Sequence, residues 1–133
     1  MRKEISIIVP ARNEEAAIRG TLEALLASTA EFLAKPLSDI RLDGSIVEIL
    51  VVDNRSTDKT GQVVAEFVKE HGVDYIVCER LGAPCARNFG TRLSRGGILV
   101  YVDADTRVPP RSLKAIYGHV HEGKRQAGIF ARS

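Results

Sequence analysis

The sequence predicts an α/β layer fold with a mainly parallel sheet, and two observations carry this prediction. Four short runs, residues 5–9, 46–52, 75–78 and 98–102, are almost continuously β-branched or aliphatic, which is typical of strands buried on both faces. Between these runs, apolar residues recur at helical spacing. Strands that alternate with helices in this way favour a parallel sheet with helices on its faces.

Each element follows from a local signal. Pro10 is expected to end the first strand, and Asn13 is expected to cap a helix over about residues 14–28. Residues 29–45 mix apolar and polar residues with Pro36 and Gly44, which predicts an irregular excursion with a short helix. Gly72 is expected to stop a second helix. Three more elements are expected: helices that open at 82–84 and 109–110, and a strand that starts at 128–130.

Length and composition set further limits. A chain of 133 residues, 44% of them hydrophobic, is the size of one domain, which we place at residues 1–133. It has no apolar run of about 18 residues, so we expect a soluble, cytoplasmic chain that can lie at the inner face of a membrane. The net charge is +2, with −4 in residues 1–78 and +6 in residues 79–133. The basic part suits an anionic ligand or a membrane, although a solvated surface also explains it. We expect no nucleic-acid partner, and free thiols at Cys78 and Cys85.

Polar residues follow three of the predicted strands. Residues 10–14 (Pro-Ala-Arg-Asn-Glu) follow the first strand, Asp53 ends the second, and Asp103-Ala104-Asp105 follows the fourth. In open α/β sheets, ligands bind outside the carboxyl ends of the strands, at the point where strand order reverses. If the order is 3-2-1-4, the first and last of these clusters meet in one crevice, with Asp53 alongside. Asp103 and Asp105 then suit a divalent cation such as Mg²⁺ or Mn²⁺, which prefers oxygen ligands and can bridge a diphosphate.

Each of these residues also has an ordinary structural explanation. An Asp-x-Asp sequence is common in turns, and either Asp53 or Ser56 can cap the next helix. Arg87 can reach a phosphate or simply form a salt bridge on a helix surface. There is no Gly-x-x-x-x-Gly-Lys-Ser/Thr loop, and no Gly-x-Gly-x-x-Gly follows the first strand, which argues against ATPases and dinucleotide-binding enzymes.

Taken together, four segments resemble a family 2 glycosyltransferase of the GT-A fold. They are ISIIVPARNEE at 5–15, EILVVDNRSTDKT at 48–60, GAPCARNFG at 82–90 and GILVYVDADT at 97–106. Their order along the chain is the family's order. The resemblance implies a three-layer α/β/α sandwich with a Rossmann-like sheet. It also implies a site for a nucleotide-diphospho-sugar and inverting transfer of the sugar to an acceptor hydroxyl of a saccharide or a lipid-linked molecule.

The resemblance also implies residue roles. Pro10, Ala11, Arg12, Asn13 and Glu14 would line the nucleoside pocket, with Glu14 near the base or ribose. Asp53 would bind the base, as in relatives that use UDP-sugars, and Arg87 would lie near the diphosphate or base. Asp103, Ala104 and Asp105 would form the Asp-x-Asp motif, in which Asp103 contacts ribose or metal and Asp105 holds Mn²⁺ or Mg²⁺.

The sequence departs from the family pattern in its last part. The chain ends 28 residues after Asp105, and the only later acidic residue is Glu122, whereas relatives carry a catalytic base and an acceptor site further on. We therefore expect a truncated, donor-binding half that does not catalyse transfer alone and that self-associates through uncovered apolar surface. The alternative is a non-catalytic module that binds a nucleotide or nucleotide-sugar. A nucleotidyltransferase is disfavoured, because Pro-Ala-Arg-Asn-Glu replaces the Gly-rich loop expected there.

Overall fold

The computed structural model describes residues 2–121 and 129–130. Its sheet contains five parallel strands in the order β3-β2-β1-β4-β5. The strands are β1 (Ile5–Ala11), β2 (Val47–Asp53), β3 (Asp74–Val77), β4 (Ile98–Val102) and β5 (Ile129–Phe130). The predicted parallel sheet and the order 3-2-1-4 of its first four strands are confirmed.

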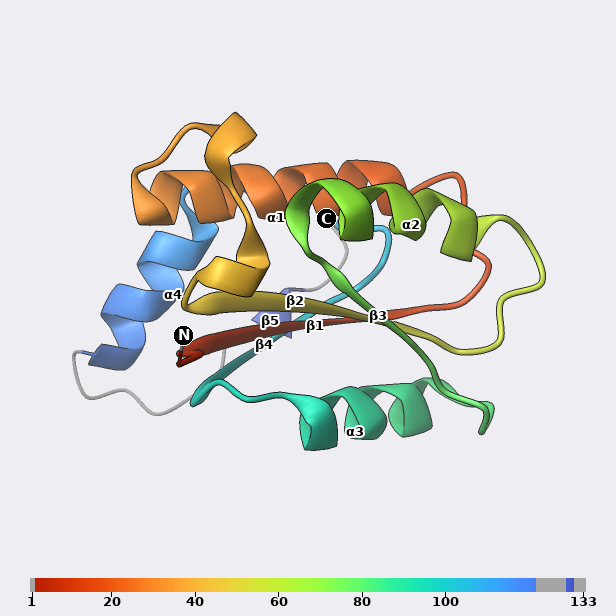
Figure 1. Cartoon of the computed structure of the whole chain (residues 1–133). Coiled ribbons are helices and arrows are strands. Elements are labelled where there is room, and N and C mark those ends of the chain that lie inside the picture. The colour runs from red at the N-terminus through yellow and green to blue at the C-terminus, as the bar shows by residue number, and fades with distance from the viewer. Residues whose placement is uncertain (1, 122–128, 131–133) are drawn as a thin grey trace.

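Helices cover both faces of this sheet and make a three-layer α/β/α sandwich (Figure 1). Figure 1 shows α1 and α2 on one side of the sheet and α3 on the other, and α4 packs against α1. The helices are α1 (Ile18–Leu33), α2 (Thr60–His71), α3 (Ala83–Leu93) and α4 (Ser112–His121). Their order along the chain is the predicted one, and Gly72 ends α2 with φ 77°, as expected.

The hydrophobic core lies mostly between the sheet and the layer that contains α1, α2 and α4. Fully buried side chains of β1 and α1, such as Ile7 and Leu22, belong to this cluster. A smaller cluster, formed by Ile8, Val52, Cys78 and Ala86, fills the space beneath α3. Cys78 and Cys85 are free thiols, as predicted.

The start of α1 differs from the sequence prediction. The helix begins at Ile18, four residues later than expected, and no side chain caps it. Asn13 has φ 52° and belongs to the loop before the helix, so its assignment as the helix cap was wrong. The helix then continues to Leu33 and ends where Ala34 adopts a left-handed conformation with φ 54°. The predicted end near residue 28 was therefore also too early.

The excursion expected over residues 29–45 is shorter and more ordered than predicted. It contains two 3₁₀ turns, η1 (Leu37–Asp39) and η2 (Leu42–Gly44). Ile40 and Leu42 are buried in the main core. The segment is therefore part of the packed structure, because its two apolar side chains cover the amino end of the sheet beside α1.

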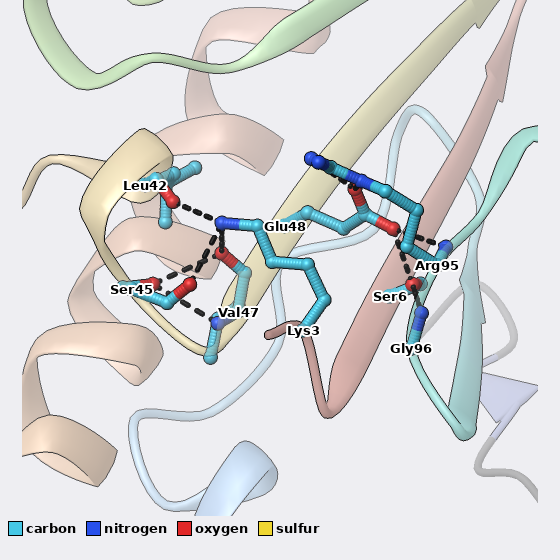
Figure 2. A network of polar contacts seen from close by, with 8 residues as sticks. All are labelled: Lys3, Ser6, Leu42, Ser45, Val47, Glu48, Arg95 and Gly96. Atoms are coloured by element: carbon cyan, nitrogen blue, oxygen red, sulfur yellow. Dashed lines mark hydrogen bonds and ion pairs between the residues drawn. The ribbon is translucent and has the colours of Figure 1, made fainter. Parts of the chain in front are cut away.

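A buried polar network secures this end of the sheet (Figure 2). Lys3 donates to the carbonyls of Leu42, Ser45 and Val47, and burial lowers its pKa, as does the positive charge of Arg95. Glu48 on β2 accepts hydrogen bonds from the hydroxyl of Ser6 on β1, at 2.6 Å, and from the backbone N–H of Arg95, at 2.7 Å. The Ser6 hydroxyl in turn accepts from the N–H of Gly96, just before β4. The network thus joins β1, β2 and β4 at their amino ends.

Among the described residues, no helix combines the length and the apolar composition needed to cross a membrane.

Candidate functional site

A cleft of about 370 Å³ opens at the carboxyl ends of β1 and β4. Strand order reverses between these two strands, so the cleft lies at the switch point where ligands bind in such sheets. Its walls come from the loops after β1 and β4 and from the first turns of α3. The lining residues are Pro10, Ala11, Arg12, Glu14, Asn54, Gly82, Ala83, Ala86, Arg87, Asp103, Ala104 and Asp105.

Pro10 explains why the sheet opens here. The strand continues through Pro10 to Ala11, so the expectation that Pro10 ends it was wrong. Pairing with β4 stops at Ile8, while pairing with β2 continues to Ala11. The Ala11 carbonyl accepts from Asn54 on the β2 side, so strand alternation turns the backbone nitrogen of Pro10 toward β4. Proline has no N–H to donate, and β1 and β4 separate where that hydrogen bond is missing.

The loop after β1 is held by the loop after β2. The Asn13 side chain accepts a hydrogen bond from the N–H of Thr57 at 2.7 Å, and the N–H of Asn13 donates to Ser56 Oγ at 2.9 Å. The N–H of Glu14 donates to Thr60 Oγ1 at 2.9 Å. Asn13 itself does not line the cleft, and its contacts instead fix the loop that presents Arg12 and Glu14 to it.

The loop after β4 is a tight turn with a carboxylate on each side of Ala104. The N–H of Thr106 donates to the carbonyl of Asp103 at 3.0 Å and closes the turn. Asp103 is exposed, Asp105 is partly buried, and both line the cleft. The described residues hold no group of three or more His, Cys, Asp or Glu side chains that could bind a metal ion. Two carboxylates fit a hard cation that takes its other ligands from phosphate and water.

The part of the cleft formed by α3 is electropositive. Ala83, Ala86 and Arg87 of α3 line the cleft, so the positive end of the helix dipole lies beside it. The guanidinium of Arg87 lies 5.8 Å from the ring centre of Tyr101 on β4, which holds it against the sheet by a cation–π contact. A ligand that combines an anionic group with a bound cation suits a cleft lined by both carboxylates and these positive groups.

Asp53 lies just behind the cleft and is not among its lining residues. Its side chain is buried: Oδ1 accepts from the N–H of Ser56 at 2.8 Å, and Oδ2 accepts from the hydroxyl of Tyr75. Burial raises the pKa of Tyr75, as does its hydrogen bond to Asp53. Asp53 does not cap the next helix, which begins at Thr60. Its binding of the base stays a prediction.

The sequence did not predict four of the cleft residues, Asn54, Gly82, Ala83 and Ala86, and Asn54 is the one with a polar side chain. It is buried, and its side chain donates to the carbonyl of Arg80 at 2.8 Å and accepts from the N–H of Gly82, also at 2.8 Å. These bonds hold the segment before α3, where Gly82 adopts φ 124°, a conformation that side chains disfavour. The only signal in the sequence was an amide next to Asp53 at the end of a strand.

Solved structures share this fold. Staphylococcus aureus TarS 1-349 in complex with UDP superposes with a TM-score of 0.71 at 26% identity, covering 90% of this chain and 32% of that chain. The mannosyltransferase PcManGT from Pyrobaculum calidifontis, in complex with GDP-Man and Mn²⁺, gives a TM-score of 0.64 at 29% identity, covering 86% and 31%. The fold is therefore that of the GT-A glycosyltransferases.

The sequence comparison identifies the family. The model described as glycosyl transferase family 2 matches residues 6–132, and the chain belongs to this family. Glycosyltransferase GlyA of Streptococcus pneumoniae serotype 4 is 28% identical over 120 residues, covering 90% of this chain and 15% of that protein. The chain thus spans about a third or less of the length of the proteins it matches here.

Proposed function

We propose that residues 1–133 are the nucleotide-sugar-binding part of a family 2 glycosyltransferase. The cleft would bind a nucleotide-diphospho-sugar, with UDP the favoured nucleotide, and the whole protein would transfer the sugar with inversion to an acceptor hydroxyl. One observation carries this proposal: the carboxylates of Asp103 and Asp105 line the same cleft as Arg87 and the amino end of α3. A diphosphate with its cation matches both sets of groups in charge.

A divalent cation, Mn²⁺ or Mg²⁺, would be held by Asp105 and Asp103. Their oxygen ligands are the kind these cations prefer, and a diphosphate supplies the remaining negative oxygens. When bound, such a cation stabilises the charge that develops on a leaving diphosphate. The complex of PcManGT with GDP-Man and Mn²⁺ supports the cation, and the complex of TarS with UDP supports the nucleotide.

The other cleft residues would bind and orient the nucleotide. Pro10, Ala11, Arg12 and Glu14 would contact the nucleoside, and Asn13 would act through the loop it fixes. Arg87 would bind the diphosphate, because its guanidinium can donate two parallel hydrogen bonds to phosphate oxygens. Asp53 would accept from the base edge if its contact with Tyr75 gave way on binding.

The general base and the acceptor are not assigned to this chain. The acidic residues of the cleft are Glu14, Asp103 and Asp105, and the proposal uses all three for the donor. We therefore expect residues 1–133 alone to bind donor without transferring sugar. Turnover by the purified 133-residue chain would contradict this. Turnover by a longer protein that contains it would exclude the alternative of a non-catalytic binding module.

Calorimetry with UDP, in the presence and absence of Mn²⁺, tests the donor site. We expect Mn²⁺ to tighten UDP binding about tenfold or more, and Asp105→Asn to abolish this gain, because an amide replaces a charged ligand. Asp39→Asn, an exposed aspartate in η1, is the matched control and should behave like the parent. UDP binding that is indifferent to Mn²⁺ and to Asp105→Asn would refute the proposal.

A further inference from the structure

Thr21, in the first turns of α1, contacts the middle residue of the Asp-x-Asp turn. Its side chain is fully buried, and its hydroxyl donates to the carbonyl of Ala104 at 2.6 Å. The same hydroxyl lies 3.3 Å from the carbonyl of Ala17. A hydroxyl has one proton to donate, and the shorter distance assigns it to Ala104.

This contact controls the peptide from which Asp105 extends. The carbonyl of Ala104 and the N–H of Asp105 belong to one planar peptide unit, so fixing the carbonyl fixes the plane. Ala104 and Asp105 are the central residues of the turn closed by Thr106 and Asp103. Type I and type II turns differ by a flip of this central peptide, and type II needs positive φ at its second central residue. Asp105 is not among the residues with positive φ, and a flip would break the bond from Thr21.

The neighbouring residue of α1 makes a second contact with the same loop. A Cβ atom added to Gly20 would lie only 2.5 Å from Nη2 of Arg107, so the guanidinium lies directly against the bare helix backbone. Two successive positions of α1, Gly20 and Thr21, therefore hold the loop on both sides of Asp105, at Arg107 and at Ala104.

We infer that Thr21 is a positioning residue for the cation site: its hydroxyl holds the Ala104–Asp105 peptide so that both carboxylates face the cleft. The inference rests on the proposed function, because it concerns the same cation. Thr21 does not line the cleft and acts only through Ala104. Its removal should therefore weaken binding that depends on the cation more than binding of the nucleotide itself.

Calorimetry on the 133-residue chain tests this with UDP and Mn²⁺ as probes. Thr21→Val removes the hydroxyl at nearly constant volume, and Thr21→Ser keeps the hydroxyl but loses the methyl group. We expect Thr21→Val to lower the UDP affinity measured with Mn²⁺ by about three- to tenfold, the equivalent of one hydrogen bond. The affinity measured without metal should not change, and Thr21→Ser should retain the gain from Mn²⁺. Thr21→Ala also lacks the hydroxyl and takes the place of Thr21→Val if that variant does not unfold cooperatively.

The outcomes separate this inference from the proposed function. A merely structural role for Thr21 would shift the melting temperature while leaving the gain from Mn²⁺ unchanged, and that result would overturn the inference alone. Equal gains from Mn²⁺ in Thr21→Val and Thr21→Ser would do the same. A parent chain whose UDP affinity does not respond to Mn²⁺ would overturn the donor site, and this inference with it.

Discussion

Replacement of Glu48 by leucine should destabilise the fold strongly, because its buried carboxylate is the acceptor for one buried and one partly buried donor (Figure 2). The Ser6 hydroxyl and the backbone N–H of Arg95 both donate to Oε2. The buried Ser6 hydroxyl left without its acceptor costs about 1–3 kcal/mol. The partly buried N–H of Arg95 costs less, because water can reach it, so Glu48→Leu should lower the free energy of unfolding by about 2–4 kcal/mol. This is a large part of the 5–15 kcal/mol or so that stabilises a typical domain. Glu48→Gln, which keeps one acceptor oxygen, should cost about 1 kcal/mol.

Arg95→Ala is the matched control, because it removes only the ion pair. The Arg95 side chain is 62% exposed, and its guanidinium lies 3.1 Å from Oε1 of Glu48. Because the guanidinium is exposed to water, we expect the pair to contribute only about 1 kcal/mol, and the backbone N–H of residue 95 survives the substitution. Urea unfolding of the three variants measures these costs, provided that the m-value, the dependence of the unfolding free energy on urea concentration, stays constant. An Arg95→Ala variant as unstable as Glu48→Leu would refute the reasoning, since the ion pair would then be the main contribution.

Three further variants test hydrogen bonding, packing and electrostatics in other parts of the fold. Asn54→Ala should lower the free energy of unfolding by about 1–3 kcal/mol and weaken UDP binding, because Gly82 loses its acceptor; unchanged urea and calorimetric titrations would contradict this. Gly90→Ala should be less stable than Gly118→Ala by about 1–3 kcal/mol in urea unfolding. A Cβ at Gly90 would lie 2.7 Å from Ile8 Cγ2, whereas one at Gly118 would meet nothing, so equal stabilities would be the contrary result. Partial burial raises the pKa of Asp74, and the charge of Glu48 adds to this. The ionised form is thus disfavoured in the folded state, so Asp74→Asn should be more stable than the parent at pH 7. The gain should shrink as pH falls through the folded pKa and vanish below about 3.9, the unfolded value; a gain that persists at pH 3 in thermal unfolding would argue against it.

The sequence was a good guide to the strands and to one side of the cleft. A strand covered on both faces must be apolar along its whole length, so the runs at 46–52 and 98–102 could be recognised without knowing their neighbours. Polar residues directly after such strands can only lie at the edge of the sheet. For this reason the sequence predicts, for the strand order 3-2-1-4, that Arg12, Glu14, Asp103 and Asp105 lie together, and the structure brings them to one cleft.

The features that the sequence did not predict depend on contacts between residues far apart in the chain. Asn13 is a residue type that often caps helices. Here its side chain instead accepts a hydrogen bond from the N–H of Thr57, 44 residues away, and α1 starts later than the sequence pattern suggests. Thr21 looks like any polar residue in an amphipathic helix until β4 brings Ala104 against it, 83 residues further on. Asn54 likewise gains its role only when the segment at 78–82 returns to it. Local propensity carries no information about such partners.

The central claim is that a divalent cation at the Asp-x-Asp turn joins a nucleoside diphosphate to this cleft. Anomalous diffraction from crystals grown with UDP and Mn²⁺ tests it most directly, since manganese can be located independently of the protein. The account predicts a manganese peak within coordinating distance of Asp105, with the diphosphate between it and Arg87. A peak elsewhere, or UDP bound in the cleft with no manganese beside Asp105, would contradict the account.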